Sequence, residues 1–201
     1  MLQTILSVFY VIIAYLLGSV CSAVIICRLF SLPDPRTEGS KNPGATNVLR
    51  IAGKKYAAIV LATDMLKGFL PVFLAKLLGA NSTTIGYICL AAVLGHIYPI
   101  FFNYKGGKGV ATTLGALLGF NWLLGGMVIG TWLVVALISR YSSLAAVVAV
   151  VLAPFYSLFI TYNIRAFVPL AIIMIFVIYK HHANLTRLVD GTEPKINLKK
   201  S

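Results

Sequence analysis

The sequence predicts an all-α, polytopic membrane protein with about seven transmembrane helices, formed as a single domain over residues 1–201. Of its 201 residues, 59% are hydrophobic and 11% are charged, whereas soluble domains contain about 25% charged residues. The hydrophobic residues also form long runs, and about 20 apolar residues are enough for a helix to cross the hydrocarbon core. Because so few polar residues cannot cover a soluble molecule of this size, a membrane is the predicted solvent.

Seven apolar runs are interpreted as membrane helices. The first has no basic residue before it and no small-residue cleavage pattern, which favours a retained helix over a signal peptide. The fourth is short for a full crossing at about 1.5 Å per residue. It is expected to be a half-helix buried among its neighbours, unless it joins the fifth in one long tilted helix. The runs are Leu2–Arg28, Tyr56–Leu78, Thr84–Phe102, Val110–Phe120, Trp122–Ile138, Leu144–Tyr162 and Ala166–Tyr179.

The basic residues predict the orientation. The net charge is +12, from 17 Lys and Arg against 5 Asp and Glu. In a soluble protein this excess would suggest nucleic acid, but here the basic residues lie between apolar runs, so no nucleic-acid partner is expected. With seven helices and the N-terminus outside, most of them face the cytoplasm, as the positive-inside rule requires. Merging the fourth and fifth runs would move Arg140 and the basic tail to the other side. The sequence therefore predicts a multi-pass protein of the bacterial inner membrane with a cytoplasmic C-terminus.

Three polar segments face the cytoplasm in this topology. The first extends from Glu38 to Arg50 and combines glycines, amides, a hydroxyl and two cations. Its glycines can turn successive N–H groups toward an anion, and Arg50 can bind phosphate with two parallel hydrogen bonds. An ordinary hydrophilic loop with an Asn-Pro-Gly turn is the alternative.

The second segment, from Tyr104 to Thr112, places three glycines and two lysines directly before an apolar helix. Free N–H groups, the helix dipole and ammonium charges together form a suitable anion site. The spacing of a Walker P-loop is absent. A basic turn that binds lipid head groups is the alternative.

The third segment begins at Lys180. If the last helix continues beyond the membrane, His181, Asn184 and Leu188 share one face. A histidine with an amide one turn away can orient or deprotonate an alcohol, although a solvated helix end explains the pattern as well. No metal site is expected, because no carboxylate or cysteine completes a ligand set with the two adjacent histidines.

Other polar residues and the cysteines have simpler interpretations. Asp64 and Lys67 are three residues apart in the second run and can pair on one helix face. His96, near the inner end of the third run, is either a packing residue or part of the site. The three cysteines lie inside apolar runs and are expected to be packing residues.

These segments resemble the three cytoplasmic motifs of the bacterial acyl-phosphate:glycerol-3-phosphate acyltransferases, the PlsY family. The similarity covers nearly the whole chain, and Asp64-x-x-Lys67-Gly68 matches as well. Lys41 stands where the family often has glycine, and His182 where a basic residue is usual, so His181 is the better catalytic candidate. The motifs are Gly39-Ser40-x-Asn42-Pro43-Gly44-Ala45-Thr46-Asn47-Val48-Leu49-Arg50, then Gly95-His96-x-x-Pro99 with Lys105-Gly106-Gly107-Lys108-Gly109-Val110-Ala111-Thr112, then His181-x-x-Asn184-x-x-Arg187-Leu188.

The resemblance implies transfer of a fatty acyl group from acyl phosphate to the 1-hydroxyl of sn-glycerol 3-phosphate. The products are lysophosphatidic acid and inorganic phosphate, in the first step of phospholipid synthesis, and no cofactor or metal is expected. Direct transfer is favoured because acyl phosphate is already activated and no Cys or Ser has an evident base beside it. A transporter of a phosphorylated solute is the main alternative, and a structural or lipid-binding membrane protein is another.

The resemblance also implies residue roles. His181 and Asn184 are expected to orient or activate the attacking hydroxyl, with a substrate phosphate as the alternative proton acceptor, and Glu193 is expected to fix the tail. Acyl phosphate, glycerol 3-phosphate and membrane lipid are the expected partners of a monomer. The predicted catalytic residues are His181, Asn184, Ser40, Arg50 and Lys108, and the predicted substrate- and phosphate-binding residues are Gly39, Asn42, Gly44, Asn47, Lys105, Gly106, Gly107, Gly109 and Ser142.

Overall fold

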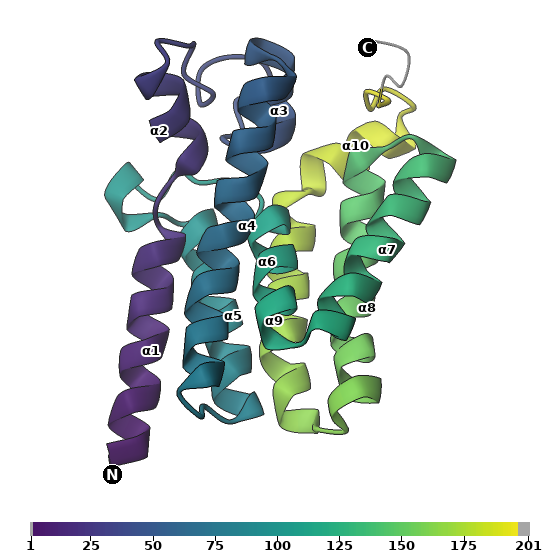
Figure 1. Ribbon diagram of the computed structural model, residues 1–201. Coiled ribbons are helices and arrows are strands. Elements are labelled where there is room, and N and C mark those ends of the chain that lie inside the picture. The colour runs from purple at the N-terminus through teal and green to yellow at the C-terminus, as the bar shows by residue number, and fades with distance from the viewer. Residues whose placement is uncertain (1, 197–201) are drawn as a thin grey trace.

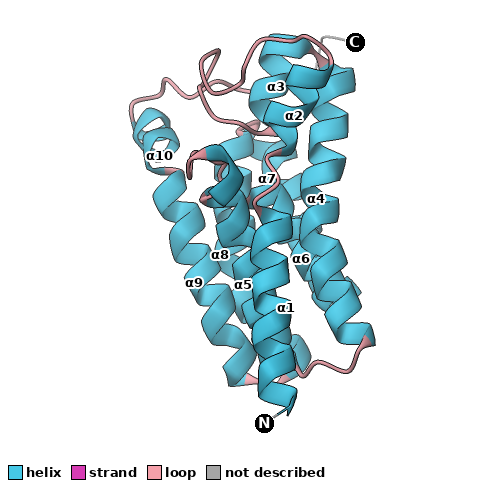
Figure 2. Ribbon diagram, turned by 90° about the vertical axis from the view of Figure 1, so that its left-hand side faces the viewer, coloured by secondary structure: helices cyan, strands magenta, loops and turns pink. Residues whose placement is uncertain are grey.

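The computed structural model describes residues 2–196 as a helical bundle without strands in that range (Figure 1). The chain runs up and down along one direction, so that the N-terminus lies at one end of the bundle and the tail at the other (Figure 2). The helices in these residues are α1 (Leu2–Gly18), α2 (Ser22–Leu29), α3 (Ala45–Ala52), α4 (Lys54–Leu77), α5 (Ser82–Ile97), the short 3-10 helix η1 (Ile100–Phe102), α6 (Val110–Phe120), α7 (Trp122–Ser139), α8 (Ser142–Thr161), α9 (Ile164–Lys180) and α10 (His182–Val189).

The predicted all-α membrane architecture is confirmed. Five helical segments in residues 2–196 are long and apolar enough to cross a membrane, and α9 with α10 makes a sixth if the pair, bent by 58°, counts as one. The remaining apolar run is α6, which begins and ends where predicted but is a shorter apolar helix. The number seven and the outside position of the N-terminus remain predictions.

Two predicted continuous helices are interrupted. The first run divides into α1 and α2, because the chain leaves the helix after Gly18 and resumes it at Ser22. The expected continuation of the last helix is also wrong in detail, since the backbone bends at His181, which ends α9 and precedes α10. In Figure 1 the α1–α2 interruption lies about half way along the molecule, and the bend before α10 lies nearer the end that contains the tail.

Close helix packing determines where these segments lie. A Cβ atom added at Gly68 on α4 would collide with the carbonyl of Thr112 on α6, and one at Gly115 would collide with the carbonyl of Met65. In lipid, such small residues let helix backbones approach one another closely. Helix α6, whose first three residues end the second polar segment, is therefore held tightly against α4.

Candidate functional site

The first polar segment is organised by Asn47. Its buried side chain donates hydrogen bonds to the carbonyls of Pro35 (2.9 Å) and Glu38 (3.0 Å) and accepts one from the Ser40 N–H (2.8 Å). All three partners lie in the loop before α3, so the Asn47 side chain fixes the shape of this loop, and the phosphate contact predicted for it stays a prediction. It leaves Gly39, Ser40 and, on α3, Arg50 exposed, while Asn42 and Gly44 are partly buried.

Lys41 adopts a left-handed conformation in this loop, with φ of 56°. Glycine adopts this region without a steric cost, whereas a residue with a Cβ atom does not. The glycine that the family resemblance implies at this position would adopt this backbone geometry without strain.

The second polar segment packs against the end of α5. The Gly107 N–H donates to the carbonyl of His96 (3.1 Å), and Cβ atoms added at Gly106 or Gly107 would collide with the carbonyl or the ring of His96. In this structure the Gly107 N–H is bonded within the protein, and the contact of Gly107 with phosphate stays a prediction. Gly106, Gly107 and Gly109 are buried, Lys105 is exposed, and the Lys108 side chain is partly buried.

The third polar segment begins at the bend between α9 and α10. His181 is buried, and its Nδ1 lies 2.7 Å from the carbonyl oxygen of Val177. A carbonyl only accepts hydrogen bonds, so Nδ1 has the proton, and Nε2 of the neutral ring is left with a lone pair. Burial lowers the pKa of His181 to about 4, with the positive charge of Lys108 acting in the same direction. His181 is therefore neutral at pH 7.

Glu193 connects the tail to two helices, α8 and α10, and its importance was underestimated from the sequence. Its Oε1 accepts hydrogen bonds from Ser143 (2.6 Å) and Asn184 (2.6 Å), and its Oε2 pairs with Arg187 Nε (2.7 Å). Burial alone would raise the pKa of Glu193, but these hydrogen bonds lower it below its ordinary value. The partner on α8 is Ser143, the neighbour of the predicted Ser142. The sequence did offer a signal for Glu193, because a carboxylate is rare in a chain with only 5 Asp and Glu.

Contacts between the segments bring the predicted site together. Lys108 donates a short hydrogen bond to Asn184 Oδ1, which joins the second segment to the third. The Pro43 carbonyl oxygen lies 3.0 Å from the position that a Cβ atom on Gly107 would occupy, which joins the first segment to the second. Burial lowers the pKa of Lys108 to about 8; Glu193 opposes this shift, and the cations Arg187 and Arg50 reinforce it. All three segments therefore contribute charge to one region.

The same sequence pattern is found in known proteins. The family model described as Glycerol-3-phosphate acyltransferase matches residues 8–191. The chain belongs to this family.

Relatives of this acyltransferase family align with almost the whole chain. A glycerol-3-phosphate acyltransferase of Legionella pneumophila (strain Corby) is 58% identical over 196 residues, which are 98% of this chain and 71% of the relative. One of Vibrio vulnificus (strain YJ016) is 54% identical over 189 residues, 94% of this chain and 92% of the relative.

Two solved structures of an integral membrane glycerol 3-phosphate acyltransferase, PlsY (YgiH), have the same fold. The glycerol 3-phosphate form superimposes with a TM-score of 0.89 at 40% identity, covering 95% of this chain and 96% of that one. The lysophosphatidic acid form gives 0.87 at 39% identity and covers 95% of each chain. The predicted family resemblance is confirmed.

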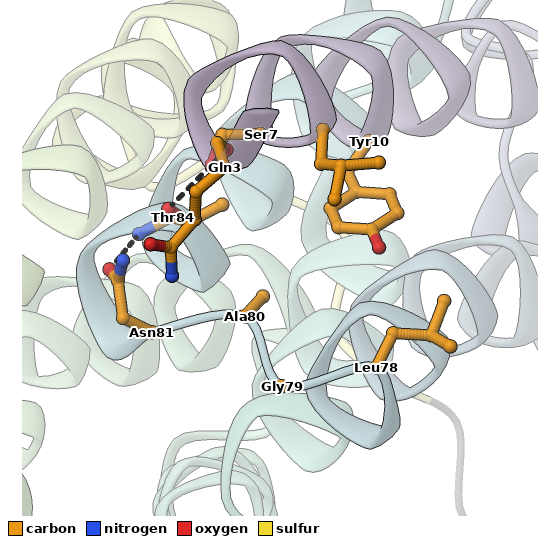
Figure 3. A pocket seen from close by; sticks show the side chains of 9 residues that line it. Gln3, Ser7, Tyr10, Leu78, Gly79, Ala80, Asn81 and Thr84 are labelled. Carbon is orange, nitrogen blue, oxygen red and sulfur yellow. Dashed lines mark hydrogen bonds between the residues drawn. The ribbon is translucent and has the colours of Figure 1, made fainter. Parts of the chain in front are cut away.

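One cavity lies away from the three polar segments. It has a volume of about 140 Å³ and lies between the start of α1 and the α4–α5 turn, where Ser7 and Thr84 share a hydrogen bond of 3.3 Å (Figure 3). No charged side chain lines it. It is at the opposite end of the bundle from the three polar segments, and no cation in its lining could neutralise a phosphate.

Proposed function

We propose that this protein transfers a fatty acyl group from acyl phosphate to the 1-hydroxyl of sn-glycerol 3-phosphate. The observation on which this proposal depends most is the hydrogen bond between Lys108 and Asn184. It brings the cationic glycine-rich segment next to the segment that contains His181. A phosphate-binding group beside a neutral histidine suits a substrate that has a phosphate and a reactive hydroxyl.

The names of the relatives support the acceptor and the product. The similar proteins are called glycerol-3-phosphate acyltransferases, and PlsY was solved in forms with glycerol 3-phosphate and with lysophosphatidic acid. Both the acceptor and our proposed donor have a phosphate group, and two phosphates held together repel unless cations neutralise them. We assign this task to Lys108, Arg50 and Lys105, with Ser40 and the free N–H groups of the loops.

The chemistry that we propose is a direct transfer. The hydroxyl oxygen of glycerol 3-phosphate forms a bond to the acyl carbon, and the bond from that carbon to the phosphate oxygen breaks. His181 Nε2 accepts the hydroxyl proton, and inorganic phosphate leaves with the electron pair of the broken bond. Cationic and N–H donors stabilise the negative charge that develops on the carbonyl oxygen. No cofactor takes part.

We further propose that the protein acts as a monomer in the bacterial inner membrane, with this site toward the cytoplasm. The polar segments and most basic residues lie at one end of the bundle, which the positive-inside rule assigns to the cytoplasm (Figure 1). The acyl chains of donor and product would then remain in the bilayer while their polar groups meet the site.

The test is phosphate release by protein purified in detergent, with palmitoyl phosphate and glycerol 3-phosphate. We expect His181→Ala to reduce kcat by about 100-fold or more, which is the usual contribution of a general base. His182→Ala is the matched control, because His182 is exposed and stacks on Tyr179; its kcat should stay within about two-fold of wild type.

Three results would change the proposal. A folded His181→Ala variant with normal kcat would assign the proton to a substrate phosphate. Turnover with acyl-CoA or acyl carrier protein but not with palmitoyl phosphate would contradict the donor. No turnover with any donor would contradict acyl transfer and favour transport of a phosphorylated solute.

A further inference from the structure

A buried charged network lies beneath the glycine-rich segment. Lys67 Nζ on α4 is 2.8 Å from Asp64 Oδ1 and donates a hydrogen bond of 2.7 Å to the carbonyl of Val20. Asp64 Oδ1 also lies 3.5 Å from His96 Nδ1 on α5. Asp64, Lys67 and His96 are 2%, 9% and 5% exposed. Charges inside a membrane bundle are costly and are rarely present without a function.

The network reaches the glycine-rich segment through His96. The backbone carbonyl of His96 accepts the Gly107 N–H at 3.1 Å. Its ring lies so close to Gly107 that a Cβ atom there would collide with Nε2. On the other side of the ring, Nδ1 has no well-aligned hydrogen bond to any described residue and faces the Asp64 carboxylate. His96 is thus held between a fixed carboxylate and the loop that precedes Lys108.

The network also reaches the interruption between α1 and α2. Val20 lies in that interruption, so its carbonyl is outside the regular α-helical ladder, and Lys67 supplies its hydrogen-bond donor. An unpaired carbonyl in a buried site costs free energy. Three elements, the α1–α2 interruption, α4 and the end of α5, therefore depend on one pair of charges.

We propose that Asp64, Lys67 and His96 are positioning residues for phosphate binding. They fix the last turn of α5, and through Gly107 they fix the loop that presents Lys108 to the substrate. They do not touch the substrate themselves. This inference rests on the proposed function of the glycine-rich segment. It gives the network a role in positioning that segment, whereas the sequence alone indicated a pair of charges on one helix face.

The experiment compares two lysines on α4. Lys67→Met removes the network's cation, and Lys76→Met is the matched control, because Lys76 Nζ also donates to a carbonyl at a helix interruption, that of Phe120 (3.0 Å). Lys76 lies toward the other end of α4, near the α4–α5 turn. For each variant we would measure kcat, the KM of both substrates and the inhibition constant of inorganic phosphate, together with the melting temperature.

We expect Lys67→Met to raise the inhibition constant of phosphate and the KM of a phosphate substrate on the order of 10-fold, since small displacements of binding groups have effects of up to about 100-fold. We expect kcat to change much less. Lys76→Met should leave both binding quantities near the wild-type values. Equal effects of the two substitutions, or a loss of kcat with unchanged phosphate binding, would overturn the proposal.

A double variant separates positioning from stability, because Lys67→Met alone leaves a buried carboxylate without its cation. Asp64→Asn/Lys67→Met removes both charges, and removing a whole buried pair is tolerated far better than removing one partner. We expect its melting temperature to recover toward wild type while phosphate binding stays weak. If the melting temperature and phosphate binding both recover, the network has a structural role alone and the positioning proposal is refuted.

The outcome is distinguishable from failure of the proposed function. If wild type releases no phosphate from the substrates, or if Lys108→Ala binds phosphate normally, the function proposed for the glycine-rich segment itself is contradicted. If Lys108→Ala is impaired while Lys67→Met behaves like Lys76→Met, only the inference about the network fails.

Discussion

Among the single residues, Lys108 has an unusual charge environment. Its ordinary pKa of 10.5 is lowered to about 8, chiefly by burial. The side chain is still mostly protonated at pH 7, and it loses its charge as the pH rises through 8. The residue that joins two segments of the site is therefore also one whose charge changes near physiological pH.

We expect phosphate binding to weaken at alkaline pH for this reason. The KM of at least one phosphate substrate should rise as the pH increases from 7 to 9.5, because neutral Lys108 attracts phosphate less. A Lys108→Arg variant, whose guanidinium stays protonated in this range, should lack the rise even if its KM is higher throughout. Initial rates measured over this pH range give the KM of the wild type and of the Lys108→Arg variant. A wild-type KM that is constant to pH 9.5 would contradict the assignment of Lys108.

At the same scale, sequence reasoning identified residue types better than it identified partners. Lys108, Asn184 and His181 were predicted as site residues, and the structure brings Lys108 and Asn184 into contact. The bonds of Asn47 and of the Gly107 N–H could not be predicted, because both depend on loop geometry that spacing does not specify.

At the scale of elements, the packing of α4 against α6 supports the glycine-rich segment from below. Gly115→Ala should lower the free energy of unfolding by about 1–3 kcal/mol, as overpacking does, because its Cβ atom meets the backbone of Met65. Gly126→Ala on α7 is the control, since its Cβ atom would meet nothing within 4 Å. Alanine favours helices over glycine by about 1 kcal/mol, so the control should be neutral or stabilising. Melting temperatures in detergent compare the two.

The helices themselves were predictable, and their interruptions were not. Hydropathy gives the apolar runs directly, because the bilayer demands them, and α6 was predicted with its exact ends. The interruption before α2 depends on Lys67, which comes from a distant part of the chain and bonds to Val20. The bend at His181 likewise accompanies contacts of α10 with the tail, and no local proline or glycine announces it.

At the scale of the whole molecule, the separation of the two ends predicts the topology. The native cysteines are all buried, so an introduced cysteine is the only one expected to react rapidly. Leu78→Cys, in the exposed α4–α5 turn, should react with a membrane-impermeant thiol reagent in spheroplasts. Thr37→Cys, in the first polar segment, should react only after permeabilisation. The reverse labelling pattern would place the α4–α5 turn in the cytoplasm and the first polar segment outside, which contradicts the predicted orientation.

Glu193 has a consequence for the order in which the molecule is made. It follows every apolar helix in the chain, yet it bonds to Ser143, Asn184 and Arg187. The first helices can enter the membrane during synthesis while this carboxylate has not yet been added. Asn184 therefore gains its full set of partners only after translation has passed the last helix. A chain truncated before Glu193 would contain every apolar helix but would lack the carboxylate that joins α8 to α10.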